Sequence, residues 1–287
     1  MRLPADLSLR DATLHDLPAI GALREAAGWS VHDWALRAVI GQPDARCVLV
    51  VDGAGDVAAV GSGIVYGPIG FIGNMVVAEG HRRRGIGSAV LTAITTFLDG
   101  TGCLRLELNA TAEGRPLYER HGFATIGTSA TARVGRDVDT AADAAVTVRG
   151  ARASDVGAVA AYDLPRFGGE RRRLLEMVSH DPAARMLIAE SGGDLAGYAC
   201  LRLDPPRIGP FLADRPGVAG ALLGHAFDSA PEVDALRVNL PPDNRDGAAW
   251  LTGLGVEVEP WDGRMARGPQ VPRREETIYG MAVGALG

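Results

Sequence analysis

The stretch HRRRGIGSAV (81–90) combines residue types that can bind a phosphate group. It follows the apolar segment GNMVV and precedes the apolar run AVLTAITTFL, which predicts a strand, a turn and a helix. The first turn of a helix has unpaired backbone N–H groups and favours negative charge. Gly85 and Gly87 would let a phosphate approach these amides, and Ser88 adds a hydroxyl. The arginines at 82–84 add charge-assisted contacts, so the stretch predicts a local anion site.

The elements that must position this turn can be read from the apolar periodicity of residues 1–135. Strands and helices alternate after an initial run of strands, which is typical of a mixed α/β sheet. The pattern predicts helices over 16–27, 31–41, 86–98 and 114–120, and strands over 46–52, 57–66, 70–77, 104–109 and 123–127.

An internal repeat divides the chain into two halves. LRDATLHDLPAI (9–20) and VRGARASDVGAV (148–159) share an Arg, an Ala two residues later and an Asp six residues later. In both, a short strand enters a loop and the Asp can begin or cap a helix. The repeat predicts two copies of one fold, and RDVDTAADAA (136–145) is the expected linker.

The order strand, Arg82-x-x-Gly85-x-Gly87, helix, LRLELN (104–109) and PLYERHGF (116–123) resembles the acetyl-CoA-binding core of the GNAT N-acetyltransferase superfamily. FIGNMVV, NATAEGRPLYERHGF and the duplicated layout are similar to tandem-GNAT proteins of the YitH-like kind. The resemblance implies two tandem GNAT-fold domains, each a mixed, mostly antiparallel sheet flanked by helices. The catalytic domain would be 1–135, and 146–287 would be a degenerate GNAT-like domain that shapes the acceptor pocket or packs against the first copy.

The same resemblance implies how acetyl-CoA, the acyl donor, would bind. The amides of the glycine turn would hold the pyrophosphate, and the main chain of one strand would pair with the pantetheine arm where strands splay apart. The implied turn residues are Arg82, Arg83, Arg84, Gly85, Ile86, Gly87 and Ser88, and the implied strand residues are Met75, Val76 and Val77.

The resemblance also implies roles at the reaction centre. Tyr118 lies where GNAT enzymes commonly have the tyrosine that protonates the thiolate leaving group; the alternative is a packed aromatic residue before Gly122 and Phe123. A backbone N–H near Met75–Val77 would meet the oxyanion. Glu107 and Asn109 share one strand face, so Glu107 is a candidate base and Asn109 a candidate pantetheine contact. The alternatives are a polar residue satisfied beneath a helix and a water chain as base, and Asn74 is a candidate for positioning substrate or water.

Acceptor binding in this family usually involves the first two helices and their loop, here GWSVHDW (28–34). Trp29 could form an aromatic wall for an organic amine, and Ser30 and Asp33 could contact it. The alternative is a helix capped by Ser30, with buried tryptophans and Asp33 as a first-turn acid.

The second copy lacks the residues that carry the expected chemistry. In ADRPGVAGALLGHAF (213–227), Asp214 stands where Arg82 stands in the first copy, and Pro216 removes an amide donor. Leu251 stands at the position of Tyr118. We therefore expect the second copy to keep the fold without this catalysis, and we expect the apolar end of the tail to pack into its sheet.

Composition limits the function classes. The 287 residues carry a net charge of −6, which argues against general nucleic-acid binding and is compatible with a small cationic amine. No apolar run approaches the roughly 20 residues of a membrane span, and no secretion signal or metal-ligand spacing is recognised. Three separated cysteines favour buried thiols in the cytoplasm. A monomer or homodimer is expected, and the alternatives in function are an acyl-CoA sensor, another acyl group, or an O- or S-acceptor.

Overall fold

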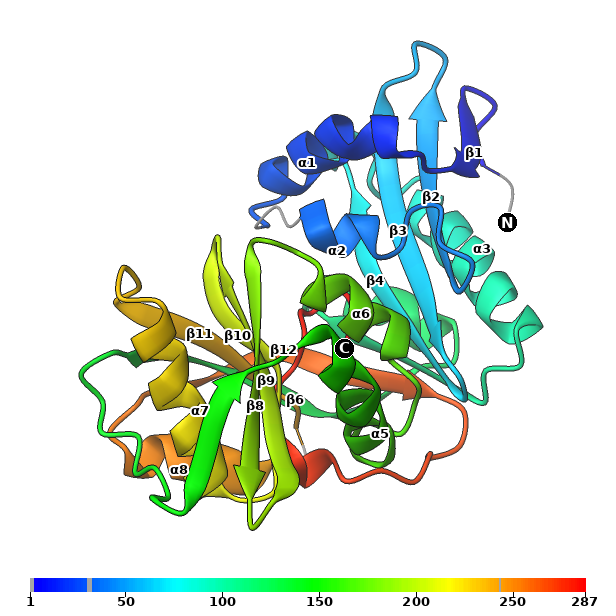
Figure 1. Cartoon of the computed structure of the whole chain (residues 1–287). Helices are drawn as coiled ribbons and strands as arrows, with labels where there is room; N and C mark the ends of the chain where they lie inside the picture. The colour runs from blue at the N-terminus through cyan, green and yellow to red at the C-terminus, as the bar shows by residue number, and fades with distance from the viewer. Residues whose placement is uncertain (1–2, 30–32, 243) are drawn as a thin grey trace. The chain divides into compact units, whose positions relative to one another are not determined.

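The computed structural model contains two compact units, and each is described by itself. Unit 1 comprises Met1–Ala124, Met265–Val271 and Leu286. Unit 2 comprises the rest of the chain, mainly Thr125–Arg264 and Pro272–Ala285. In both, helices pack against a mostly antiparallel sheet, as the sequence predicts (Figure 1). The described residues are 3–29, 33–242 and 244–287.

Unit 1 is built on strands β1 to β5, which are neighbours in the order of the chain. Antiparallel pairing joins β1 to β2, β2 to β3 and β3 to β4, whereas β4 and β5 are parallel. A parallel pair needs a crossover connection, and the helix α3 supplies it. The strands are β1 (Leu7–Asp11), β2 (Ala45–Asp52), β3 (Val57–Tyr66), β4 (Ile69–Val77) and β5 (Arg105–Ala110).

Glycines on β3 let α3 approach this sheet closely. A Cβ at Gly63 would lie 2.7 Å from Ile94 Cγ2, and a Cβ at Gly61 would overlap Val90. Figure 1 shows α1 and α2 on the face of these strands opposite to α3. The helices are α1 (Leu17–Ala26), α2 (Asp33–Arg37), α3 (Ile86–Gly100) and α4 (Arg115–Arg120), with the short turn η2 (Glu79–His81) before α3.

Unit 2 repeats this plan. Strands β7 to β10 form antiparallel neighbours, and β11 lies parallel to β10. The strands are β6 (Ala124–Gly135), β7 (Val146–Gly150), β8 (Ala184–Ser191), β9 (Asp194–Leu203), β10 (Pro206–Ala213), β11 (Ala235–Leu240), β12 (Val258–Arg267) and β13 (Ile278–Gly280). The helices are α5 (Val156–Phe167), α6 (Arg172–Ser179), α7 (Pro216–Ser229) and α8 (Arg245–Gly253).

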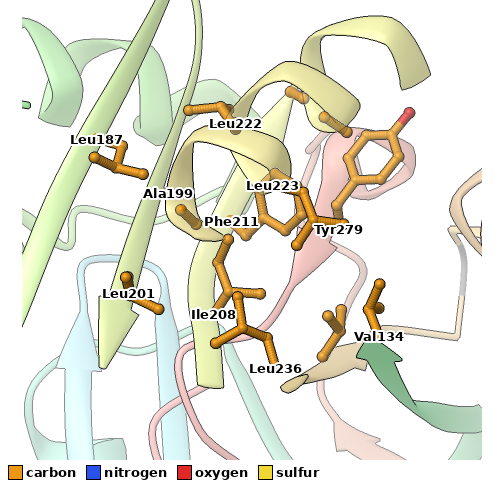
Figure 2. Packing of buried hydrophobic residues seen from close by; sticks show 14 of the residues in the cluster. Val134, Leu187, Ala199, Leu201, Ile208, Phe211, Leu222, Leu223, Leu236 and Tyr279 are labelled. Carbon is orange, nitrogen blue, oxygen red and sulfur yellow. The ribbon is translucent and has the colours of Figure 1, made fainter. Parts of the chain in front are cut away.

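The core of unit 2 forms where α7 covers its sheet. Figure 2 shows Leu222 and Leu223 of α7 above Phe211 and Ile208 of β10, with Tyr279 beside them. Other strands contribute small or branched side chains, which let the helix pack closely on the sheet. The labelled strand residues are Val134, Leu187, Ala199, Leu201 and Leu236.

The compact units do not end where the expected domains end, because strands at the ends of the two copies lie in the other unit. We expected a first domain of 1–135, but β6 pairs antiparallel with β11 of unit 2, from Leu240↔Ala130 to Ala235↔Gly135. In return, Met265–Val271 belongs to unit 1, where Arg267 donates to Asp99 Oδ1 at 2.7 Å.

The repeated Arg–Asp motif performs the same structural task in both units. Asp16 accepts hydrogen bonds from Arg10 Nη2 at 2.7 Å and from the Thr13 N–H at 2.8 Å. Asp155 accepts from Arg149 Nη1 and from the Arg152 N–H, both at 2.7 Å. In each unit the aspartate closes a single turn, η1 (Leu14–Asp16) or η3 (Ala153–Asp155), from which the first helix begins. The predicted role of the aspartates at helix starts is confirmed.

Within the described part of the chain, no helix has the length and hydropathy needed to cross a bilayer. The same residues contain no group of three or more His, Cys, Asp or Glu side chains that could hold a metal ion. Cys47, Cys103 and Cys200 are free thiols, and burial raises the pKa of Cys47 and of Cys200 to about 12.

Candidate active site

The turn between β4 and α3 has the backbone of an anion cradle. Gly85, the N-cap residue of α3, has a φ of 80°, in the left-handed region that L side chains disfavour. A Cβ at Gly87 would lie 3.3 Å from Leu117 Cδ2 and 3.6 Å from Val77 Cγ2, so glycine leaves room beside the first turn. The unpaired amides at the start of α3 can therefore be approached closely by a phosphate.

The three arginines of the turn have different partners. Arg82 donates to Glu113 Oε1 at 3.0 Å, and Arg84 donates to both carboxylate oxygens of Asp6 at 3.0 and 2.9 Å. The Arg84 hydrogen bond lowers the pKa of Asp6. Arg83 is exposed and forms no ion pair with any residue that the structure describes. Exposed ion pairs contribute little to stability, so Arg82 and Arg84 could turn to a phosphate at low cost.

Helix α4 lies beside this turn and carries Tyr118. Ser88 Oγ and His121 Nε2 are hydrogen-bonded at 2.7 Å, which joins the start of α3 to the end of α4. Burial, followed by the nearby arginines 120 and 267, lowers the pKa of His121. Tyr118 is only 6% exposed and meets the Phe123 ring edge-on, with 6.2 Å between ring centroids. The tyrosine is therefore held in one position next to the cradle.

Strand β4 contains a bulge at its centre. The pairing with β3 shifts between Val60 and Ser62, which leaves Asn74 and Met75 opposite the single residue Gly61. Asn74 has a φ of 56°, a conformation that few residues other than glycine adopt. A bulge interrupts the ladder and redirects backbone groups, as a strand that must present an N–H to a ligand requires.

A buried polar network fixes this bulge. The Asn74 side chain is 2% exposed; its Nδ2 donates to Ser62 Oγ at 2.8 Å, and its Oδ1 accepts from Arg24 Nη1. Arg24 of α1 is 5% exposed, and its guanidinium lies 5.6 Å from the centroid of the Trp29 ring. Burial lowers the pKa of Arg24. The Asn74 side chain thus fixes the conformation of the strand at the bulge.

The parallel strands β4 and β5 separate beyond their first residues. Their pairing runs from Ile69↔Arg105 to Ile72↔Leu108, and among the described residues it continues no further. Strand β4 itself extends to Val77. The main chain of the last residues of β4 is therefore not paired with β5, at the position expected for pantetheine, and we call this unpaired stretch the gap between β4 and β5. Within it, Arg82 Nε donates to the Val77 carbonyl oxygen at 3.2 Å.

The candidate base Glu107 lies in the closed part of this ladder, opposite Phe71. Its carboxylate is fully buried and accepts from Arg105 Nε. The ion pair with Arg105 thus occupies the carboxylate that a general base would need. This geometry favours the alternative in which Glu107 is a satisfied polar residue. Asn109, half-buried, is the first residue of β5 beyond the pairing.

The residues expected to bind the acceptor do not all lie around one cavity. Trp29 is half-buried and contacts Arg24, as given above, while Ser30 lies outside the described residues. Asp33 begins α2 and is exposed. It lines a cavity of 420 Å³ between α1 and α2 together with Glu25, Arg37 and apolar residues of α1. Neither Trp29 nor Asn74 lines this cavity.

In unit 2, the residue at the position of Arg82 is bound within the unit. Asp214 Oδ1 accepts from Arg166 Nη2 at 2.5 Å and from the Tyr162 hydroxyl at 3.0 Å. The Arg166 guanidinium also lies over the Tyr162 ring, 3.4 Å from its centroid. The carboxylate of Asp214 therefore stabilises α5 of its own unit, and its negative charge would repel a phosphate group.

The expected linker covers the N-terminal turns of α7, the helix that corresponds to α3. The Asp143 N–H donates to the Gly217 carbonyl oxygen at 3.1 Å, and its carboxylate accepts from Arg215 Nη2 at 2.7 Å. A Cβ at Gly220 would overlap the carbonyl oxygen of Thr140. In unit 2, the position of the phosphate cradle is thus occupied by the chain itself.

In unit 2, the C-terminal tail occupies the position that corresponds to the gap between β4 and β5. Strands β10 and β11 pair only at Arg207↔Arg237, and β13 then pairs antiparallel with β10. On its other side, the Met281 N–H donates to the Asn239 carbonyl oxygen of β11 at 2.7 Å. The prediction that the apolar tail joins the sheet of the second copy is confirmed.

Sequence reasoning missed three residues that support the site: Arg24, Ser62 and His121. Arg24 follows Ile20 by four residues on the apolar face of a predicted helix, and a basic residue on that face is a signal of a buried polar network. The contacts of Ser62 and His121 join segments that are distant in sequence, and no local pattern encodes them.

Comparisons with known proteins find acetyltransferase (GNAT) domains in both halves of the chain. A model of the acetyltransferase (GNAT) family matches residues 12–123, and a model of the acetyltransferase (GNAT) domain matches residues 159–280. The uncharacterized N-acetyltransferase YitH of Bacillus subtilis is 25% identical over 238 residues, which cover 82% of each chain.

Two solved structures show the same fold. A putative acetyltransferase from Pyrococcus horikoshii has a TM-score of 0.83 and 23% identity, over 100% of this chain and 98% of its own. A tandem GNAT protein from the clavulanic acid biosynthesis pathway has a TM-score of 0.63 and 17% identity, over 92% of this chain and 99% of its own.

Proposed function

Since the chain belongs to the GNAT superfamily of acyltransferases and carries two GNAT domains in tandem, we propose that it is an acetyl-CoA-dependent N-acetyltransferase. It transfers the acetyl group to the amine of a small molecule, in a direct attack on the thioester. The observation that carries the proposal is the combination, in unit 1 alone, of the glycine cradle, the bulge at Asn74 and the gap between β4 and β5.

The donor site suits acetyl-CoA. The left-handed Gly85 and the missing side chain of Gly87 leave room for a pyrophosphate on the α3 amides, and Ser88 adds its hydroxyl. Arg83 is available to the phosphates, and Arg82 and Arg84 can exchange their exposed carboxylate partners for them. The main chain of Met75–Val77 would pair with the pantetheine arm, with Asn109 across the gap. Bound acetyl-CoA supplies the activated acyl group.

Residues of unit 1 then supply the proton for the leaving group and stabilise the charge that develops in the reaction. Tyr118, on the helix beside the cradle, gives its hydroxyl proton to the departing thiolate. A backbone N–H at the bulge stabilises the oxyanion, and the network of Asn74, Ser62 and Arg24 keeps that N–H in place. Water takes the proton of the amine, because Arg105 already occupies the carboxylate of Glu107.

The acceptor would approach from α1, α2 and their loop, with Trp29 as an aromatic wall and Ser30 and Asp33 as polar contacts. Asp33 and Glu25 outnumber Arg37 in the lining of this cavity, so its net negative charge suits a cationic amine. Unit 2 supplies structure rather than a second donor site, and its expected part in shaping the acceptor pocket remains a prediction. Free thiols at all three cysteines suit a reducing cytoplasm.

The test measures binding and turnover separately. Calorimetric titration with CoA should show a single site, and thiol release from acetyl-CoA should depend on an added amine from a panel of small primary amines. A parallel panel of alcohols and thiols, and propionyl-CoA in place of acetyl-CoA, examines acceptor and acyl group. Tight CoA binding without turnover on any panel would replace the enzyme proposal by an acyl-CoA sensor.

A further inference from the structure

Four arginines lie in register across the sheet of unit 2. Arg202 of β9 is paired with Arg207 of β10, Arg207 with Arg237 of β11, and Arg237 with Arg133 of β6. Directly paired residues of neighbouring strands have their side chains on the same face, about 4.5–5.5 Å apart at Cβ. The four side chains therefore form one row, which we call the arginine row.

The arginine row lies on the face of the sheet away from α7. Its sequence neighbours Leu201, Ile208, Leu236 and Val134 belong to the core that α7 covers. Because side chains alternate along a strand, each arginine next to them points to the opposite face. The row is thus outside the apolar cluster that α7 covers.

The positive charges of the row are poorly balanced. Arg202 donates to Asp181 Oδ2 at 2.7 Å. Arg133 and Arg237 are exposed and Arg207 is 4% exposed, and none of these three forms an ion pair with a described residue. The buried Nε of Arg207 has no hydrogen-bond partner. Like charges directly opposite in a sheet repel, so three neighbouring guanidinium groups need an anion.

The electrostatics of Arg207 agree with this reading. Burial, followed by the charges of Arg237 and Arg202, lowers the pKa of Arg207 to about 10. With the Asn239 amide oriented to satisfy its neighbours, its oxygen accepts from Arg207 Nη2 at 3.2 Å and its nitrogen donates to Thr131 Oγ1 at 3.0 Å. These are neutral partners, and they leave the charge uncompensated.

In the first copy, an ion pair neutralises the arginine at the corresponding position. LRLELN of β5 corresponds to LRVNLP of β11, so Arg105 matches Arg237 and Glu107 matches Asn239. In unit 1, Glu107 pairs with Arg105, and the β4 residue opposite Arg105 is Ile69. In unit 2 the carboxylate has become an amide, and an arginine replaces the isoleucine.

We propose that the arginine row is a binding site for a small oxyanion, bearing phosphate or carboxylate groups. The anion lies between Arg133, Arg207 and Arg237, with the guanidinium groups as charge-assisted donors and Thr131 and Asn239 as polar neighbours. Planar guanidinium groups bind phosphates and carboxylates in bidentate fashion, which fits either source of the oxyanion.

The test uses the full chain with Arg83→Gln, which weakens phosphate binding at the cradle of unit 1. At constant ionic strength, inorganic phosphate or malonate replaces chloride, and thermal unfolding and calorimetry report binding. We expect one of the two anions to raise Tm. In the further variant R133Q/R237Q, the affinity should fall about tenfold or more, because two charged donors are lost. The preferred probe identifies phosphate or carboxylate as the source.

Arg185→Gln is the matched control, because Arg185 lies on β8 beyond the row and has Glu232 at 3.9 Å. It should leave the anion response unchanged. In chloride alone, R133Q/R237Q should be at least as stable as its parent, since repulsion is relieved, whereas a purely structural row would lose stability. The site is excluded if neither anion raises Tm, or if the rise persists in R133Q/R237Q.

Discussion

The two units differ in what lies between two parallel strands of the sheet. These strands are β4 and β5 in unit 1, and β10 and β11 in unit 2. Past Ile72↔Leu108, β4 continues beside a gap. Past Arg207↔Arg237, the second gap holds β13, which pairs with β10, and Met281 directly after β13 donates to Asn239 of β11. One fold therefore leaves these strand ends unpaired in one copy and encloses a strand of its own chain in the other.

The difference extends to the helix that begins beside each gap. In unit 1 the turn before α3 has glycines where a phosphate would approach, whereas in unit 2 residues 140–143 of the linker lie against α7. If the second copy lacked only the arginine that Asp214 replaces, one substitution could restore it. Backbone that fills the corresponding positions at both ends cannot be removed by one substitution, so we expect the second copy to act as a scaffold.

The largest effect should follow from Tyr118→Phe, the residue that Leu251 replaces in the second copy. The change removes the hydroxyl and keeps the ring that contacts Phe123. Because a positioned general acid contributes about 10²-fold or more, turnover should fall by that factor while the Kd for CoA stays near its original value. Stopped-flow thiol release and calorimetry measure the two quantities.

Tyr279→Phe is the matched control, since this buried tyrosine belongs to the core of unit 2. It should leave turnover unchanged. Equal activity of Tyr118→Phe and the original chain would remove Tyr118 from the mechanism.

A smaller effect, about tenfold, should follow from Gly85→Ala. The left-handed conformation costs an alanine roughly 1–2 kcal/mol, so the turn will relax away from the geometry that presents its amides. The affinity for CoA should fall about tenfold, with less effect on turnover at saturation. Gly53→Ala, where a Cβ meets nothing within 4 Å, should not change affinity. Unchanged CoA binding in Gly85→Ala would place the pyrophosphate elsewhere.

Gly217→Ala makes the corresponding change in the second copy. A Cβ there would lie 2.9 Å from Asp143 Cβ, so the linker must shift. We expect lower stability without any change in CoA affinity, as measured by thermal unfolding and titration.

The sequence predicted most helices and strands of the first copy, because each depends on short-range patterns, although the helix expected over 31–41 is shorter, Asp33–Arg37. Glycine spacing located the cradle, and the Arg–Asp repeat located the first helix of each unit. The bulge in β4 was not predicted, since it depends on the pairing with β3 and on a buried arginine from α1.

Long-range pairing explains the other differences. Nothing in the local pattern of residues 124–135 indicates that β6 will join β11, because a strand's partner is chosen by the whole sheet. Likewise, the motif HRRRGIGSAV does not reveal that Arg82 and Arg84 have Glu113 and Asp6 as partners. Sequence therefore predicted which residues could bind a phosphate, but not which of them are already paired.

The aspartates of the repeat should give a small and equal effect in the two copies. Asp155→Asn and Asp16→Asn each remove a charged acceptor at a helix start and should lower Tm by about 2–4 °C. The Arg149 hydrogen bond lowers the pKa of Asp155 to about 2, from an ordinary value of 3.8.

Because the folded pKa is lowered, the stabilisation from Asp155 is present above pH 4 and is lost as the pH falls toward 2. The difference in Tm between the original chain and Asp155→Asn should therefore be constant from pH 7 to 5 and then shrink. A difference that persists at pH 2 would show that the charge of Asp155 is not its cause.

No second donor site should appear in Asp214→Asn/Pro216→Ala, which removes the repulsive charge and restores an amide donor in unit 2. If those two residues alone had disabled the second copy, calorimetry would now show two acetyl-CoA per chain. We expect a single equivalent, because the linker still lies on α7 and β13 still occupies the gap beside β10. The same substitutions in a Gly85→Ala background sharpen the result, since any added tight binding there must come from unit 2. Such binding would mean that β13 and the linker can be displaced, and that the second copy is a latent site rather than a scaffold.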